Sequence, residues 1–235
     1  MGAIYKRELT AYFISPIGYV FVGMFLLASG VLFCLSTLYA ATSSLANYFT
    51  YILMSFVVLI PLLTMRLLSE ERKLRTEQLL LTSPVSLSAM VFAKFAAAVT
   101  LFAATLFLSC INFLFIRPEY GTVNVPVMIA QLVGVLLVGI AFCALGLFMS
   151  ALTENQLIAA LLSIGAIFAF LGLGFITGSV ENTALRVVLK WFSVFDRFYT
   201  FSFGLFDFVS VIYYLSIAFV FLFLTVRVLE KRRWE

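Results

Sequence analysis

The sequence has no histidine, three cysteines and only 11% charged residues. Cys34, Cys110 and Cys143 stand singly inside apolar runs, with no CxxC pair and no histidine to complete a metal or redox site. We therefore expect them to be packing residues. No serine, cysteine or carboxylate has a base near it in the sequence, so acid–base and nucleophilic catalysis lack a candidate set of residues.

A nucleotide-binding motif is also missing. No lysine is followed by serine or threonine, so the chain has no GxxxxGKS or GxxxxGKT phosphate loop. The sequence therefore predicts that this chain is not an enzyme. It also predicts that the chain carries no cofactor and no metal of its own.

The low charge content indicates a membrane protein, because soluble proteins carry about 25% charged residues. Hydrophobic residues make up 64% of the chain and its mean hydropathy is +1.15. Apolar runs of about 20 residues, the length that crosses a bilayer as a helix, recur along the sequence. They predict an all-α integral membrane protein that forms one domain over residues 1–235. Six transmembrane helices are expected at about 17–40, 48–68, 87–116, 126–152, 156–178 and 208–229.

Lysine and arginine are unequally divided between the two sides of these spans. Four of them, Arg117, Arg186, Lys190 and Arg197, fall on one side, and the other eleven fall on the side of both termini. The positive-inside rule then places both termini in the cytoplasm. A net charge of +4 is compatible with a nucleic-acid partner, but the basic residues flank the spans. They are better explained as topology signals beside membrane lipid, and no nucleic acid is expected.

The span interiors hold almost no charge, which disfavours an ion-coupled carrier. Lys94 lies about two turns inside the third span, and we expect it to extend its ammonium to the cytoplasmic interface. Asn112 and Gln131 are the deepest amides, and either a contact between helices or a substrate contact explains them.

An amphipathic elbow helix is expected at residues 2–15, before the first span. Its predicted apolar face consists of Tyr5, Leu9, Tyr12 and Phe13. Its predicted polar face consists of Lys6, Arg7 and Thr10, and Pro16 follows the helix. Such a helix lies in the cytoplasmic interface. An extended basic flank is the alternative.

The densest charge lies between the second and third spans, in RLLSEERKLRTEQLLLTSPVS from Arg66 to Ser86. In hydrocarbon each unpaired charge costs roughly 2.5–3.5 kcal/mol, so this segment must lie outside the bilayer. We expect a short helix at about 69–83, docked into a soluble partner, with a solvated hairpin as the alternative. Its candidate coupling residues are Glu70, Glu71, Arg72, Lys73, Arg75, Thr76 and Glu77.

A second polar stretch, at about 180–207, precedes the last span on the outer side. Leu185, Val188, Leu189 and Phe192 follow helical spacing opposite charged residues, which predicts a short amphipathic helix. The aromatic residues after it indicate either an interfacial belt, a short re-entrant piece or an aromatic loop.

Three stretches resemble one family. SEERKLRTEQLLLTSPVS, the opening KRELTAYFISPIGYVF and the ending YYLSIAFVFLFLTVRVLEKRRW are similar to permease subunits of ABC exporters of the second permease family. The resemblance is strongest to the gliding-motility-type permeases. It implies an elbow helix, a coupling helix after the second span, and a bacterial plasma membrane as the location.

The resemblance also implies partners. Two copies of an ABC ATPase would hold ATP and Mg, and a second permease subunit would complete a homodimer or heterodimer. Gliding-type permeases often work beside a membrane protein with a large extracytoplasmic region. An exporter is the leading hypothesis, and a membrane anchor that transmits force to such a partner without transport is its rival.

Overall fold

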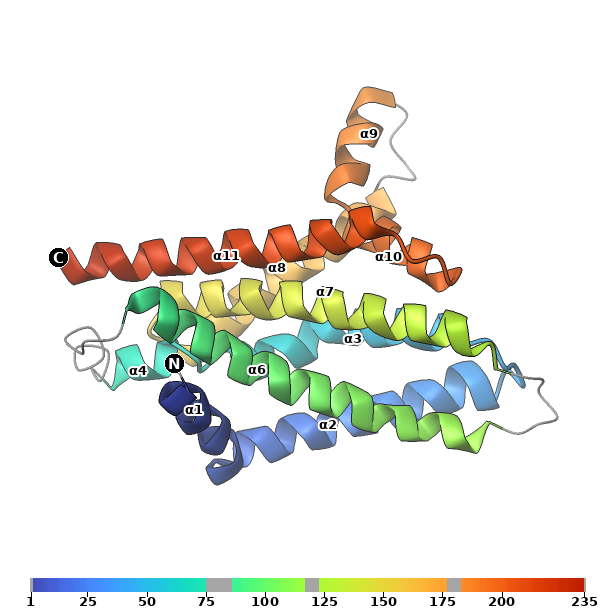
Figure 1. Ribbon diagram of the computed structural model, residues 1–235, viewed down its shortest axis with the longest axis horizontal. Coiled ribbons are helices and arrows are strands. Elements are labelled where there is room, and N and C mark those ends of the chain that lie inside the picture. Colours follow the sequence, from blue (N-terminus) through green and yellow to red (C-terminus); the bar gives the residue numbers. More distant parts are fainter. Residues whose placement is uncertain (1, 75–85, 117–122, 177–182, 235) are drawn as a thin grey trace.

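Six long apolar helices run along the long axis of the molecule in the computed structural model (Figure 1), each long and apolar enough to cross a membrane. The structure describes residues 2–74, 86–116, 123–176 and 183–234. The spans are α2 (Pro16–Phe33), α3 (Ala46–Thr64), α6 (Leu87–Ser109), α7 (Val125–Leu152), α8 (Gln156–Ile176) and α11 (Phe208–Trp234). Because no strand occurs among the described residues, the predicted all-α fold with six spans is confirmed.

Some span ends differ from the apolar runs. α2 continues through a π-helical turn at Cys34–Leu38, and α6 continues through a 3₁₀ turn at Cys110–Phe115. α3 stops at Thr64, short of the predicted 68, because the chain turns there toward the next short helix. α11 instead extends to Trp234, past the predicted 229, since its charged last turns remain helical beyond the apolar run.

Among the described residues, four shorter helices lie toward the two ends of the bundle (Figure 1). α1 (Gly2–Ile14) and α4 (Ser69–Lys73) lie at the end that carries both chain termini, here called the termini end. α9 (Thr183–Phe192) and α10 (Val194–Ser202) lie toward the opposite end, the far end, and α9 points away from the bundle. The predicted outer segment is thus two helices, and its residues 180–182 lie outside the described part.

Side-chain caps explain where several helices begin. Asn124 Oδ1 accepts from the Val127 amide at 3.4 Å at the start of α7, and Ser193 Oγ accepts from the Asp196 amide at 3.1 Å at the start of α10. Before α11, Asp207 accepts from the amide and the hydroxyl of Ser210. The hydrogen bond from the Ser210 hydroxyl, followed by that from the Val209 amide, lowers the pKa of the Asp207 carboxyl.

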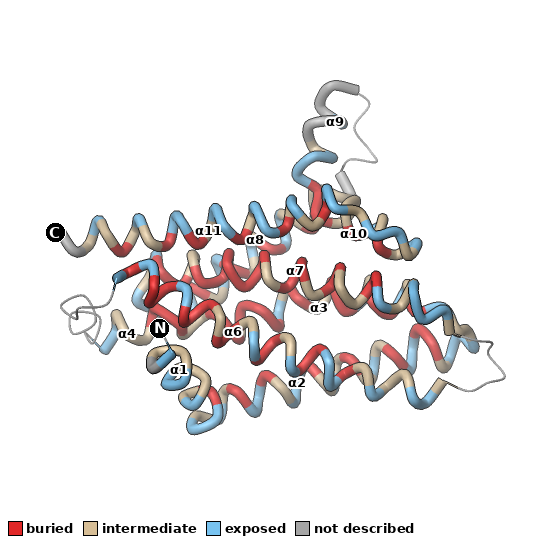
Figure 2. Tube along the Cα trace, viewed as in Figure 1, coloured by how far each residue is buried: buried red, intermediate tan, exposed pale blue. Residues whose placement is uncertain are grey.

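α7 and α3 form the centre of the bundle (Figure 2). In the most apolar 18-residue stretch of each span, 67% of α7 and 61% of α3 is buried inside the protein. The corresponding share in the other four spans is 22% to 33%. Gly146 permits the close approach of these two helices, because a Cβ at that position would lie 2.2 Å from Thr64 Oγ1. The outer spans therefore present apolar faces to their surroundings, as expected of helices in lipid.

Aromatic packing joins α2 and α3 to α6. The rings of Phe25, Phe56 and Phe102 lie 5.3 to 6.4 Å apart and all three side chains are fully buried. Nearer the far end, Asn112 Nδ2 donates to Ser29 Oγ at 2.8 Å, and Ser29 shares a hydrogen bond of 2.8 Å with the Tyr48 hydroxyl. Asn112 therefore makes a polar contact between helices, one of the two explanations that its sequence position left open.

Candidate functional site

The charged segment after the second span begins as α4, which is held on α7 by one serine. Ser150 Oγ accepts from the amides of Leu68 and Ser69, each at 3.1 Å, and donates to the Met65 carbonyl at 3.0 Å. One hydroxyl has one proton and two acceptor sites, so Ser150 is fully used. Sequence reasoning missed this residue, because a lone serine near the end of an apolar helix gives no distinctive signal.

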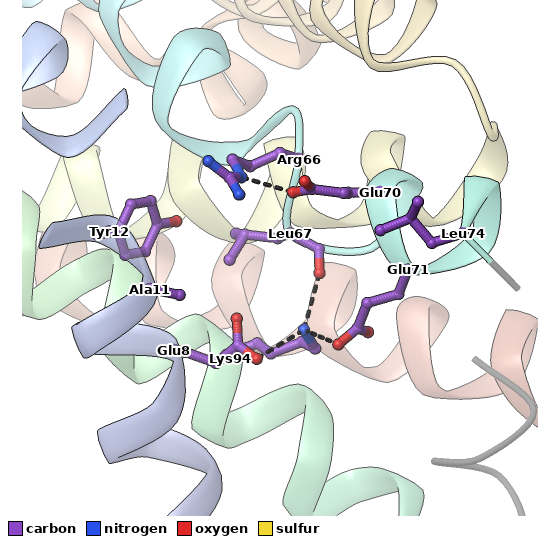
Figure 3. A pocket seen from close by; sticks show the side chains of 9 residues that line it. All are labelled: Glu8, Ala11, Tyr12, Arg66, Leu67, Glu70, Glu71, Leu74 and Lys94. Atoms are coloured by element: carbon purple, nitrogen blue, oxygen red, sulfur yellow. Dashed lines mark hydrogen bonds and ion pairs between the residues drawn. The ribbon is translucent and has the colours of Figure 1, made fainter. Parts of the chain in front are cut away.

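Lys94 occupies the centre of the site (Figure 3). Its side chain is only 1% exposed, and its Nζ lies 2.8 Å from Glu71 Oε1 and 3.2 Å from Glu8 Oε1. The ammonium also donates to the Leu67 carbonyl oxygen at 2.9 Å. These three acceptors match the three protons of an ammonium group.

Lys94 does extend its ammonium toward the termini end, to α1 and α4, but the group is buried by protein there instead of being exposed. Carboxylates from α1 and α4 lie within reach, and they satisfy the charge where it stands, inside the protein. A buried charge is tolerated only when it is paired and hydrogen-bonded in this way. Glu8, from α1, was not among the residues that the sequence singled out.

Arg7 completes this cluster. Its Nη2 lies 2.6 Å from Glu8 Oε1 and 3.0 Å from Glu71 Oε1. The hydrogen bond to Glu8 is the main reason why the pKa of the Arg7 guanidinium is raised. Two cations, Arg7 and Lys94, thus face two carboxylates, Glu8 and Glu71. We call these four residues the Lys94 cluster, which joins α1, α4 and α6 without net charge.

A second ion pair fixes the turn before α4. Arg66 Nε lies 2.7 Å from Glu70 Oε2, and Arg66 Nη1 donates to Ser15 Oγ at 2.8 Å. The buried Tyr12 hydroxyl donates to the Leu63 carbonyl at 3.0 Å. α1 is therefore attached to the end of α3 through Tyr12, and Ser15, the residue after α1, contacts the turn that follows α3.

The residues on the outward side of α4 lie outside the Lys94 cluster and are more exposed. Arg72 Nη2 lies 2.8 Å from Glu154 Oε1 and so connects α4 to the turn between α7 and α8. Lys73 and Leu74 are exposed, and the leucine retains 64% of its accessible surface. The candidate coupling residues thus divide into Glu70, Glu71 and Arg72, which pair within the chain, and Lys73, which faces solvent. Arg75, Thr76 and Glu77, with the rest of the predicted helix to 83, lie outside the described residues.

The predicted elbow residues also differ in how far they are buried. The Tyr5 hydroxyl donates to Thr100 Oγ1 on α6 at 3.1 Å, Tyr12 is buried, and Leu9 is half-buried. Phe13 is exposed and packs edge-on against Tyr19, with ring centroids 6.0 Å apart. Lys6 and Arg7 are exposed, as expected for the polar face.

The chemistry of this end of the bundle is electrostatic. A cavity of about 170 Å³ opens beside the Lys94 cluster, between α1, α4 and α6 (Figure 3). Within the described part of the chain no three histidine, cysteine or acidic side chains gather as metal ligands. What the ion pairs can do is hold a short charged helix firmly against the ends of several spans.

A family model described as "ABC-2 family transporter protein" matches residues 6–229 of this chain. The match includes most of α1, α4 with the Lys94 cluster, five complete spans and α11 as far as residue 229. No match was found among curated proteins.

Proposed function

This chain belongs to the ABC-2 family of transporter proteins, and we propose that it is the permease subunit of an exporter driven by a separate ATPase subunit. Two ATPase copies would bind ATP and Mg, and a second permease subunit, identical or different, would complete the transporter. The termini end would face the cytoplasm of a bacterium. A membrane protein with a large extracytoplasmic region is a further expected partner.

The observation that carries this proposal is the firm attachment of α4. Ser150 holds its first amides on α7, the Lys94 cluster holds it on α1 and α6, and Arg72 holds it on the turn before α8. A push on α4 would therefore move the ends of several spans together. This is the mechanical property that a coupling helix needs.

Lys73 offers the cleanest test of ATPase docking, because it is exposed and reversing its charge leaves the paired residues of α4 intact. We expect Lys73→Glu to weaken ATPase binding roughly 1.4- to 5-fold, since an exposed ion pair is worth about 0.2–1 kcal/mol. Co-purification and ATP turnover of the complex measure the effect. Lys190→Glu, on α9 at the far end, is the matched control. ATPase binding equally unaffected by both substitutions would contradict docking at α4.

Reconstitution separates the exporter from its rival, the anchor that transmits force. With the ATPase present in lipid vesicles, ATP-driven movement of a labelled lipid or solute supports an exporter. Stimulated ATP turnover without any such flux supports the force-transmitting anchor. Flux driven by a proton or sodium gradient in the absence of the ATPase would overturn both.

A further inference from the structure

A groove of about 330 Å³ lies between the first turns of α6 and the second half of α11. In Figure 1 the start of α6 lies close to α11 near the termini end, and the two helices diverge toward the far end. The apolar walls of the groove are Val91 and Phe92 on α6 and Phe219, Leu222, Phe223 and Val226 on α11. Phe92 and Phe219 are 55% and 71% exposed, so the groove is open on the outside of the bundle, where lipid surrounds the spans.

Two opposite charges, Arg227 and Glu230, lie side by side at one end of this groove. Arg227 Nη1 lies 2.8 Å from Glu230 Oε2, and the guanidinium carbon lies 5.0 Å from the centroid of the Phe223 ring. The ion pair and the ring hold the guanidinium in place. The two side chains still keep 63% and 41% of their accessible surface. Because a guanidinium has five N–H donors and a carboxylate has two acceptor oxygens, each group can bind a further partner.

The position of this pair along α11 is that of a lipid headgroup. From Phe208, the first residue of α11, to Arg227 the helix rises about 28 Å at 1.5 Å per residue, close to the roughly 30 Å of hydrocarbon in a bilayer. Asp207 precedes the helix and marks the opposite interface, because a carboxylate is costly in hydrocarbon. Arg227 and Glu230 therefore lie at the level of the lipid phosphates at the termini end.

The apolar part of the groove fits one acyl chain. Its walls on α11 extend from Phe219 to Val226, about 10 Å at 1.5 Å per residue. The chains of one leaflet occupy about 15 Å, half of the roughly 30 Å of hydrocarbon. A chain that starts at the level of Arg227 would therefore lie against these walls for most of its depth.

The two charges together define the headgroup. A phosphate accepts charge-assisted hydrogen bonds from an arginine, so it fits Arg227. Glu230 attracts an ammonium group and repels a headgroup that is anionic overall. A zwitterionic phospholipid carries a phosphate and an ammonium next to each other, and thus matches both side chains.

We infer that this groove is a binding site for a zwitterionic phospholipid of the leaflet at the termini end. Its phosphate would contact Arg227, its ammonium Glu230, and one acyl chain would lie between α6 and α11. The inference goes beyond the proposed function, because lipid binding here requires neither an ATPase nor transport. It concerns the outer face of two spans, whereas the proposed function depends on α4.

Native mass spectrometry of the full chain, released from detergent micelles, tests the site. The zwitterionic and anionic probes are phosphatidylethanolamine and phosphatidylglycerol with identical acyl chains, and we expect phosphatidylethanolamine to bind more tightly. Arg227→Gln should weaken its binding roughly 2- to 10-fold, the equivalent of one hydrogen bond. Lys73→Gln is the matched control, because Lys73 is an exposed cation at the same end but belongs to α4. Its lipid affinities should equal those of the wild type.

Glu230→Gln tests the ammonium contact by itself. It should abolish the preference for phosphatidylethanolamine while both lipids still bind, a result that a loss of folding would not give. Three results would each overturn the inference: equal affinity of the wild type for both lipids, equal phosphatidylethanolamine affinity in the wild type and Arg227→Gln, or a preference that persists in Glu230→Gln. A changed dimer fraction in Arg227→Gln with unchanged lipid binding would assign the groove to a second copy of the chain and overturn it as well.

Discussion

Lys94 and Ser150 show how much a single residue contributes to this bundle. Each is a polar side chain in a span, and each uses its full hydrogen-bonding capacity. Lys94 satisfies carboxylates from two other helices, and Ser150 satisfies backbone groups of the turn before α4. Neither faces lipid, because pairing inside the protein removes the cost of the polar group.

The Lys94 cluster predicts a large loss of stability when its central charge is removed. Lys94→Met removes the buried ammonium that pairs with Glu8 and Glu71, two carboxylates in a largely buried place. Breaking a buried ion pair typically costs about 3–5 kcal/mol. We expect the free energy of unfolding in detergent micelles to fall by about that amount, measured by denaturant titration.

The double variant Lys94→Met with Glu71→Gln is the control for this prediction. It restores neutrality, so part of the loss should be recovered, and the two substitutions should be non-additive by about 0.5–3 kcal/mol. Strict additivity would mean that the two side chains do not interact.

Among the elements, α4 depends most on contacts outside itself. Five helical residues are too few to be stable alone, and no side chain caps the start of the helix. Its first amides bond instead to Ser150 on α7. α1 has the same character, since Tyr5, Tyr12 and Arg7 attach it to other helices.

This dependence predicts the effect of Ser150→Ala. The substitution leaves the amides of Leu68 and Ser69 without acceptors, and a buried group without its partner costs about 1–3 kcal/mol. Hydrogen exchange of these two amides should accelerate roughly 5- to 100-fold, as measured by mass spectrometry. Ser163→Ala, which removes a hydroxyl bonded within α8, should leave their exchange unchanged. Equal exchange in both variants would show that Ser150 does not hold α4.

At the scale of the whole molecule, the bundle has two chemically different ends. The termini end carries paired charges on α1, α4 and α6. The far end carries the aromatic helix α10 and a cavity of about 260 Å³ whose described polar side chains are uncharged. Between them, α7 and α3 form the buried centre and the other spans surround it. The two ends are thus suited to different partners.

Cysteine labelling tests the orientation of these ends. In a variant without the native cysteines, Ser44→Cys at the far end should react with an impermeant maleimide on intact cells. Lys73→Cys should react only after permeabilisation if, as we propose from the excess of lysine and arginine, its side faces the cytoplasm. Both positions are exposed. The reverse pattern would contradict cytoplasmic termini, and labelling of both cysteines on intact cells would contradict a spanning bundle.

The six spans could be predicted from the sequence because hydrocarbon imposes a length and a composition that each helix meets by itself. The cluster of charges after the second span could be recognised for the same reason, since it cannot remain in the bilayer. Asn112 and Gln131 could be recognised as buried amides, but their partners Ser29 and Ser202 could not be named.

Tertiary structure alone decided which charges face inward. Glu70 and Glu71 look equivalent in the sequence, yet Glu70 pairs with Arg66 at the turn and Glu71 with the buried Lys94. Likewise, Ser150 and Ser163 are both serines in apolar helices, and only Ser150 reaches another element. The physical reason is that entering the membrane is a property of each segment, whereas pairing a charge or a hydroxyl depends on which segments become neighbours.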